Sequence, residues 1–539
     1  MKPRFRLFAI VASMILALPG TAASSTVWET FTESPLGGKI NNVEEPRVDR
    51  LRPRPERISE DLPKPEDGQL SISVEDAVVF ALRNNRSLAV QLFSPIIAGT
   101  FEEQERAVFD ASLFAETSLS REKIERNNLV TGKPVGLRSE SETYRAGIGR
   151  RLSTGTSVDL SVRQSRSDSG TVLDRQAAGV ELSLTQALLR GAGRKVNLAG
   201  IRQAELDTMI SIHEVRGFTE ALVAETETTY WDLLLAERQV LIFREALRIA
   251  RQQVEDIERR IAVGTVAETE LAAAQAELAS RRQGLINAHS RREKNRLSLL
   301  RLINPGSSDA WLLELEPRDC PKEPDIELDP PGDHVALGLS LRPELAEAEL
   351  RIEQGDLEVI QTRDGLLPRL DLFITLGKTG YADSFGGSFS DITGPGYRVA
   401  GGVSFEWSLK NRAARAAERR ALAGRGQAVA SLDNMAQLIV EDILGAHVEA
   451  CRARAQIEAS AERRRLQEEV VRSEKVKFDV GRGTSLAVAL AQRDLLESRL
   501  DEVDAIIGYR KARIALYRLD GSLLMRRGIV VDADLFAGE

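Results

Sequence analysis

The fold is decided by the segment Arg260-Ile261-Ala262-Val263-Gly264, which returns 217 positions later as Lys477-Phe478-Asp479-Val480-Gly481. The same offset relates further pairs that follow each glycine: Ala274-Gln275 and Ala491-Gln492, Leu278 and Leu495, Arg282 and Arg499, Lys294 and Lys511, Leu302 and Leu519. An ungapped match of this length indicates an internal duplication, in which one structural unit is used twice.

Each of the two glycines ends a long segment with a seven-residue apolar repeat. The first repeat is Leu233, Val240, Leu247, Val254 and Ile261, with Ala236, Phe243, Ala250 and Ile257 three residues on; the second is Ile443, Ala450, Ile457, Val471 and Phe478, with Arg464 as a polar break. This spacing is typical of the a and d positions of a coiled coil. One helix from Asn197 to Ile261 would be about 100 Å long at ~1.5 Å per residue, so it must pack lengthwise on its neighbours.

Before each helical segment the apolar period changes to two. Apolar residues alternate with polar ones at Val158–Val162, Val180–Leu184, Leu370–Leu376 and Val403–Leu409. This pattern predicts strands whose two sides face unlike environments. Taken alone, such strands fit a sandwich or a barrel with lipid outside and water inside, and the long helices favour the barrel.

The remaining segments set the domain boundaries. A helix is predicted from Ser71 to Gln91, capped by Ser73, with a counterpart from Asp333 onward. We therefore expect a first repeat at 71–303, a proline-rich linker at 304–332 and a second repeat at 333–524, followed by a C-terminal tail at 525–539.

The N-terminal residues have the features of a secretory signal. Lys2, Arg4 and Arg6 precede an apolar stretch and the small residues before position 24, so residues 1–23 are predicted to be a cleaved signal peptide. Residues 24–70 form a polar arm with several prolines. Beyond the signal peptide, charged residues interrupt all of the apolar stretches. Any membrane insertion of the mature chain is therefore expected to use strands.

Composition and motifs exclude several classes of function. The 539 residues carry a net charge of −8, whereas a nucleic-acid-binding protein is expected to be basic. The chain has four histidines, none at close ligand spacing, and His213-Glu214 lacks the second histidine of a zinc-protease motif because Gly217 stands there. We expect no enzyme activity, no cofactor and no metal. Cys320 and Cys451 lie far apart in the sequence and are expected to be free thiols.

With its signal peptide, duplicated strand and long-helix halves, and Val-Gly turns followed by Ala-Gln helices, the chain resembles the TolC-type outer-membrane efflux proteins. The resemblance spans about Ser71 to Leu524. It implies a homotrimer in which each chain gives four strands to one outer-membrane β-barrel, continued across the periplasm by α-helical coiled coils. It also implies two partners, a periplasmic adaptor and an inner-membrane pump, and the role of exit duct in efflux or type I secretion. Strand-like segments between Tyr144 and Arg166 depart from the pattern, and the sequence leaves open whether they form an extra hairpin.

The resemblance also implies sites at the periplasmic end. The adaptor-docking tip would comprise Val263, Gly264, Thr265, Val480, Gly481 and Thr484. Some relatives narrow the aperture with acidic residues beyond the turn glycine, but Leu486 and Leu490 stand there in this chain, which predicts an apolar constriction. Any negative charge nearby would come from Glu268 and Glu270. Apolar residues at helical spacing also fit the seam of a coiled coil, so both roles stay open for the leucines.

A second class of function fits the same helices. A secreted coiled-coil scaffold or adhesin would have the heptads and the signal peptide without any conduit. Trimer migration that changes on heating, together with partition into the outer membrane, would separate the two classes. The sequence does not name an exported substrate or the class of pump.

Overall fold

The computed structural model describes residues 68–127, 134–169, 172–265, 267–305, 310–320 and 328–529. All of them belong to one compact unit, 53–539. The predicted signal peptide, most of the polar arm, and the tail beyond residue 529 lie outside the described residues.

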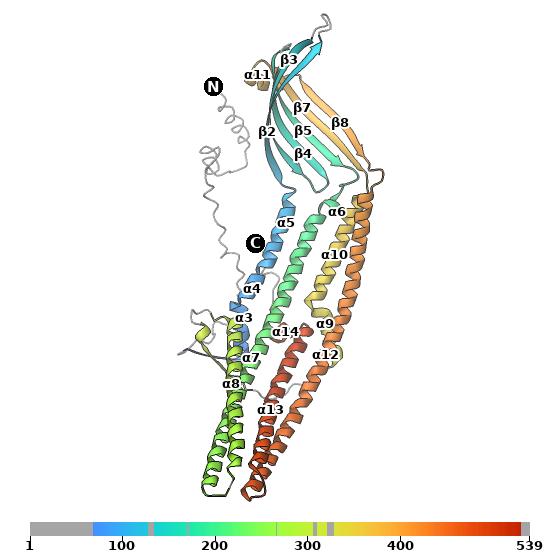
Figure 1. Cartoon of the computed structure of the whole chain (residues 1–539). Helices are drawn as coiled ribbons and strands as arrows, with labels where there is room; N and C mark the ends of the chain where they lie inside the picture. The colour runs from blue at the N-terminus through green and yellow to red at the C-terminus, as the bar shows by residue number, and fades with distance from the viewer. Residues whose placement is uncertain are drawn as a thin grey trace. The chain divides into compact units, whose positions relative to one another are not determined.

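A six-stranded antiparallel sheet forms one end of this unit, in the order β2-β3-β4-β5-β7-β8 (Figure 1). The strands are β2 (Ala111–Asn127), β3 (Pro134–Arg151), β4 (Thr156–Ser169), β5 (Val172–Ala187), β7 (Arg369–Ala382) and β8 (Tyr397–Glu406). The prediction of four strands per chain is wrong, because this sheet has six. The sequence left open whether the segments between Tyr144 and Arg166 form a hairpin; β3 and β4 pair along their length, so they do.

The strand predicted at Val403–Leu409 ends earlier than expected. Glu406 pairs with Arg369, the first residue of β7, and the residue before it is Pro368. Because proline has no N–H, it cannot extend the ladder. Trp407 and Leu409 therefore lie beyond the sheet and are exposed where the chain turns into the next helix.

Four long helices carry the chain away from the sheet: α7 (Ala199–Ala262), α8 (Thr269–Ile303), α12 (Arg412–Asp479) and α13 (Ser485–Leu519). α7 packs against α8 and α13, and α12 packs against α13. The predicted heptads are confirmed by burial, since Leu233, Val240 and Leu247 are buried in the first helix and Ile443, Ala450 and Ile457 in the second. The polar break at Arg464 is explained by ion pairs with Glu468 and Glu502.

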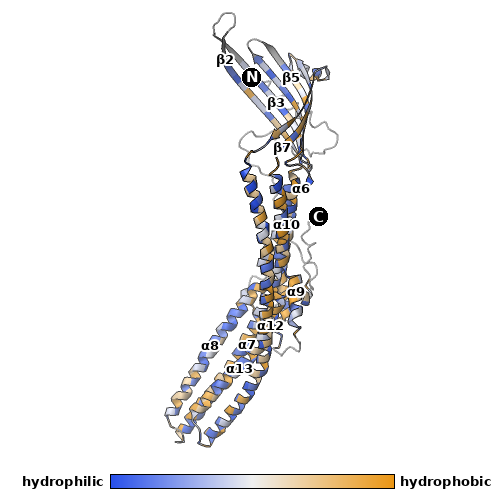
Figure 2. Ribbon diagram, turned by 90° about the vertical axis from the view of Figure 1, so that its right-hand side faces the viewer, coloured by the Kyte–Doolittle hydropathy of each residue, from blue (hydrophilic) through white to orange (hydrophobic). Residues whose placement is uncertain are grey.

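Shorter helices lie alongside the long ones, between the sheet and the middle of the helical part (Figure 1). They are α3 (Val74–Asn84), α4 (Arg86–Gln91), α5 (Phe93–Ala107), α6 (Arg194–Asn197), α9 (Pro331–Leu341), α10 (Pro343–Asp364) and α14 (Leu523–Arg526), with a further short helix α11 (Phe385–Ser390) between β7 and β8. α10 packs against both α7 and α12, and α5 packs against α7. Figure 2 shows apolar residues, in orange, concentrated where α10 and α7 run side by side, whereas much of α8 is hydrophilic.

The single helix predicted at Ser71–Gln91 is instead a short strand followed by two helices. Ser73 does cap α3 in a capping box with Asp76, as expected. The helix then breaks at Asn85, whose Oδ1 accepts hydrogen bonds from the backbone N–H groups of Ser87 and Leu88. Arg342 breaks the second half with the same extended backbone, with ψ of 125° against 121° at Asn85, but its side chain does not cap the next helix.

The sequence did not predict the parallel pair formed by β1 (Gln69–Ile72) and β6 (Glu314–Pro317). Leu70, Ile72 and Leu315 from these strands are fully or almost fully buried, in the main hydrophobic core with Tyr230 and Trp231 of α7. The pair therefore attaches the start of the first half to the segment that links the two halves.

Within the described residues, no helix has the length and apolar character needed to cross a membrane. Cys320 and Cys451 are exposed, and neither forms a disulfide within the described residues.

Candidate functional site

The two helical turns at the end farthest from the sheet have the same backbone geometry. Gly264 and Gly481 have φ of 73° and 74°, in the left-handed region that favours glycine. The amide of Thr265 donates to the carbonyl of Arg260 at 2.9 Å, and the amide of Arg482 donates to the carbonyl of Lys477 at 2.8 Å. Both are the bonds of a Schellman motif, which ends a helix by satisfying its last carbonyl groups.

The predicted docking residues come together on these two turns. Val263 and Val480 each precede a glycine, and their side chains are 72% and 65% exposed. Thr265 Oγ1 donates to the carbonyl of Arg260, whereas Thr484 caps α13 by accepting from the amide of Ala487. The two tips thus present one exposed valine each beside a left-handed glycine.

Side chains join the two tips to each other, and no pattern in the sequence predicts these contacts. Arg260 Nη2 lies 2.8 Å from Asp479 Oδ1, and the Arg260 guanidinium lies 4.9 Å from the centre of the Phe478 ring. The hydroxyl of Ser485 donates to the carboxylate of Glu270. These residues are more than 200 positions apart in the chain, so neither propensity nor heptad spacing relates them.

The proposed aperture residues differ in their surroundings. Leu486 and Leu490 are 55% and 42% exposed, whereas Val488 and Ala489 between them are buried. The two leucines therefore do not belong to the seam that α13 forms within the chain. Glu268 is exposed, and Glu270 is half-buried against Ser485. Only the first of these carboxylates is open to solvent.

The sheet has one apolar and one polar face. A single row of apolar side chains crosses all six strands, each directly opposite the next: Leu113, Ile148, Leu160, Leu182, Leu376 and Val399. The neighbouring row on the opposite face is small or polar, and in it Ser183 Oγ lies 3.2 Å from Thr375 Oγ1. Five of the six residues in the apolar row are exposed. Among the described residues of the single chain, no layer covers this face.

Buried polar groups hold the middle of the helical part together. Arg527 makes two hydrogen bonds of 2.6 Å to the carboxylate of Glu227, which is buried on α7. His334 is fully buried, with Nδ1 2.6 Å from Asp520 Oδ2. Burial raises the pKa of Glu220, also on α7, to about 7. These groups join α7, α9 and the chain after α13, so they fix the helix arrangement.

Among the described residues, no group of three or more His, Cys, Asp or Glu side chains is placed to hold a metal ion. The features with functional potential are the tips, the apolar sheet face and the junction between sheet and helices.

Comparison with solved structures shows the fold. The Campylobacter jejuni CmeC outer membrane channel aligns with a TM-score of 0.62 at 16% identity, covering 84% of this chain and 86% of that chain. The Vibrio cholerae outer membrane protein VceC aligns with a TM-score of 0.61 at 17% identity, and the alignment covers 83% of this chain and 96% of VceC. The open state of the Neisseria gonorrhoeae MtrE outer membrane channel aligns with a TM-score of 0.60 at 17% identity, and the alignment covers 86% of this chain and 98% of MtrE. No match was found among curated proteins.

A family-level comparison of the sequence goes further than the fold. The sequence model described as outer membrane efflux protein matches residues 155–305 and 336–522, which is more than half of the chain. The two matched segments each contain strands, a long helix and one of the glycine turns described above. The chain therefore belongs to the outer membrane efflux protein family, the TolC-like channels.

Proposed function

We propose that three copies of this chain form the exit duct of a tripartite efflux or type I secretion system. The duct passes substrates from an inner-membrane pump and a periplasmic adaptor through the outer membrane. The observation that carries the proposal is the apolar row across all six strands. An exposed apolar surface of this extent is typical of a membrane or protein interface.

The edges of the sheet support assembly into a closed ring. β2 and β8 each pair on one side only, so their outer backbone groups have no partner within the sheet. Six strands are fewer than the eight with which closed outer-membrane barrels begin. Pairing of β8 with β2 of the next chain repeats around a rotation axis and leaves no edge. Three chains of six strands would supply eighteen.

Sedimentation of the purified protein in detergent tests this assembly. Analytical ultracentrifugation is expected to show one species with three times the mass of the chain. A preparation that contains only monomer or dimer would contradict the ring. Heating before electrophoresis should shift the band, because closed strand pairing resists detergent until it is melted.

The competing function, a secreted coiled-coil scaffold or adhesin, leaves the apolar row unexplained. A scaffold exposed to water would gain nothing from six strands with an uncovered face of leucine, isoleucine and valine. Recovery of the protein from the soluble extracellular fraction, with none in the outer membrane, would favour the scaffold.

We place the docking of the adaptor at the two tips. Val263 and Val480 supply exposed apolar contacts next to the left-handed glycines, and Thr265 and Thr484 fix the flanking backbone. The ion pair between Arg260 and Asp479 holds the two tips together within one chain. The adaptor would therefore meet a preformed surface made by both halves.

We place the closed aperture at Leu486 and Leu490. Both side chains are exposed in the single chain, and neighbouring helices of a trimer would cover or enclose them. Rings of leucine can close a pore by excluding water, without any ring of charge. A cation preference, if present, would come from Glu268 more than from Glu270, whose carboxylate is already bonded to Ser485.

Leu490→Asp is expected to raise single-channel conductance and cation selectivity in planar bilayers, because it replaces an apolar constriction with charge. Val448→Asp is a matched control, since Val448 is exposed on α12, outside the α13 turns that form the proposed constriction. Unchanged currents from a folded Leu490→Asp trimer would assign the leucine to the packing between chains.

A further inference from the structure

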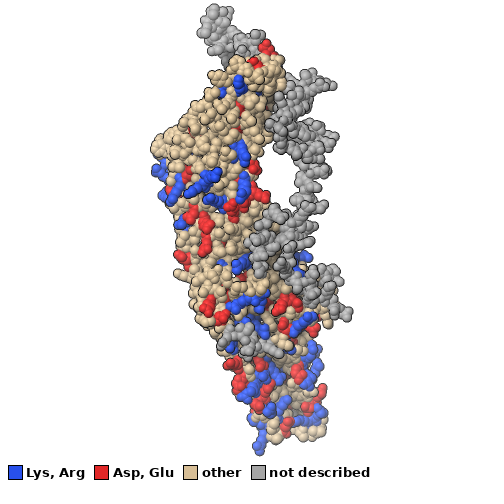
Figure 3. Space-filling view, turned by 180° about the vertical axis from the view of Figure 1, so that it is seen from behind, with Lys and Arg blue, Asp and Glu red and all other residues tan. Residues whose placement is uncertain are grey.

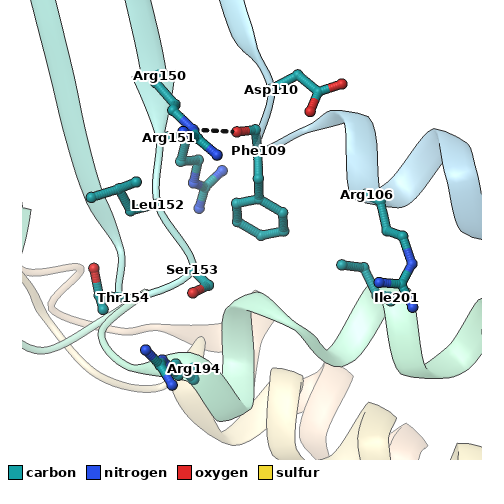
Figure 4. A pocket seen from close by; sticks show the side chains of 10 residues that line it. All are labelled: Arg106, Phe109, Asp110, Arg150, Arg151, Leu152, Ser153, Thr154, Arg194 and Ile201. Carbon is teal, nitrogen blue, oxygen red and sulfur yellow. Dashed lines mark hydrogen bonds between the residues drawn. The ribbon is translucent and has the colours of Figure 1, made fainter.

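A hollow of about 470 Å³ lies where the sheet meets the helices. Figure 4 shows its lining, which comes from the end of α5, the end of β3 and the loop after it, α6 and the start of α7. Four arginines from these separate elements line it: Arg106, Arg150, Arg151 and Arg194. Figure 3 shows that charged side chains of both signs, Lys and Arg among them, begin at this level, where the mostly uncharged surface of the sheet ends.

The positive charge of the hollow is largely uncompensated. Arg106 is paired with Glu102 and Glu205. In contrast, Arg150 Nε donates to the carbonyl of Phe109 at 2.9 Å, and Arg151 Nη2 donates to Asn197 Oδ1 at 3.0 Å. These two acceptors are neutral.

Arg194 adds a third such charge. In the described part of the chain, neither it nor Arg150 nor Arg151 makes an ion pair. Asp110 is the one carboxylate that lines the hollow, so an anion would meet a net positive field.

Apolar side chains share the hollow with the arginines. Phe109, Leu152 and the buried Ile201 line it beside the guanidinium groups. A free inorganic anion gains nothing from such side chains, whereas an amphiphile with an anionic head does. The lining therefore suits a ligand that has both a charged and an apolar part.

The register of the sheet places this hollow at the end of the apolar face. Ile148 belongs to the apolar row, and Arg150 lies two residues further along β3, on the same face. Arg150 pairs with Ala111, the first residue of β2, which follows the end of α5 after a short connection that contains Phe109 and Asp110. The apolar face thus gives way to arginine at its helix-proximal edge, as at the boundary between lipid tails and water.

We propose that this hollow binds the phosphate group of an anionic phospholipid, with the acyl chains lying along the apolar face of the sheet. The guanidinium groups of Arg150 and Arg194 hold the phosphate oxygens, because a planar fork of N–H donors matches their geometry. This inference rests on the proposed function for its orientation, in which the apolar face contacts lipid. It adds a ligand and a set of residues that would set the depth of the protein in the membrane.

Binding is tested on the purified full-length protein in a neutral detergent, by isothermal titration calorimetry. The probes are dihexanoylphosphatidylglycerol, dihexanoylphosphatidylcholine and inorganic phosphate. Wild-type protein is expected to bind the phosphatidylglycerol at least about tenfold more tightly than the other two. The choline cation of phosphatidylcholine cancels the net charge that the arginines attract, and inorganic phosphate has no acyl chains to contact the apolar side chains. Equal binding of inorganic phosphate would assign the hollow to a free anion and overturn the lipid.

Two variants locate the binding. Arg150→Gln and Arg194→Glu are each expected to weaken phosphatidylglycerol binding about tenfold or more. Arg194 is exposed with no described partner, so its substitution should leave the fold intact even if Arg150→Gln does not. Arg248→Gln, on the exposed surface of α7, is the matched control and should bind as the wild type does. Wild-type affinity in Arg194→Glu would overturn the site.

This assay does not measure transport, so its failure is distinct from a failure of the proposed function. A conducting trimer without phosphatidylglycerol binding would overturn the lipid site alone. Lipid binding by a protein that never conducts would overturn the duct and leave the site standing.

Discussion

Leu376→Lys is expected to reduce the amount of protein in the outer membrane about thirtyfold or more. Leu376 stands in the apolar row, directly opposite Leu182 on β5 and Val399 on β8. Lysine on the lipid-facing side of a strand near the middle of a bilayer costs roughly 2–4 kcal/mol, and in a trimer each of the three chains would carry the substitution. Quantitative immunoblotting of outer-membrane and soluble fractions measures the effect.

Thr375→Lys is the matched control for this change. Thr375 is the adjacent residue on the same strand and points to the other face of the sheet, where it contacts Ser183. A water-filled interior tolerates a lysine there, so near-normal amounts are expected in the outer membrane. Equal losses in both variants would mean that the two faces have the same surroundings, which would contradict the proposed orientation.

Gly481→Trp is expected to abolish export while leaving the trimer and its membrane insertion normal. The φ of 74° disfavours any residue with a Cβ, by roughly 1–2 kcal/mol, and a built Cβ meets no other atom within 4 Å. The change therefore distorts the turn and places a bulky ring on an open surface. If the tips dock an adaptor, the affinity should fall about thirtyfold or more, as at an interface hot spot. Gly264→Trp should act in the same way, since its φ is 73°.

Gly481→Asn separates docking from mere helix capping. Asparagine tolerates the left-handed conformation, so this variant keeps the turn and adds only a small side chain. The measurement is export in a strain that lacks the native chain and carries each variant, with the substrate that such a strain fails to export. Export is expected to persist with asparagine and to be lost with tryptophan. Normal export in both tryptophan variants would show that the glycines only end their helices.

The long helices were predictable because the residues that they bury recur every seven positions within one continuous segment. Leu233, Val240 and Leu247 are buried at the intervals that the heptad requires. The tips were predictable for a related reason: an internal copy of the turn marks both Gly264 and Gly481, and only glycine enters that conformation freely.

The features that could not be predicted depend on long-range pairing. β1 and β6 are four residues long and about 245 positions apart, too short and too distant for any periodic signal. The link between Arg260 and Asp479 is similarly remote. No proline marks the break at Asn85, where the side chain of this residue caps the next helix. In the second half, Pro343 marks the equivalent break.

The predicted number of strands was wrong for a different reason. β2 has exposed apolar residues at Leu113 and Leu119, but the alternation between them is broken, since Phe114 is apolar on the opposite side of the strand and Thr117 is polar on the same side. An edge strand with so few apolar residues has a weak alternation, so sequence pattern does not distinguish it from a polar loop. Its pairing with β3 over 17 residues supplies the backbone hydrogen bonds that define it.

If copies of this chain form the proposed duct, they enclose a water-filled passage through a membrane. Current across a planar lipid bilayer to which purified trimer has been added tests it most directly. We expect stepwise increases in conductance, each from the insertion of one trimer, with low current per step while the leucine constriction is closed. A trimer that inserts into the bilayer, as shown by its recovery with lipid, and yet carries no current under any applied voltage would contradict the account.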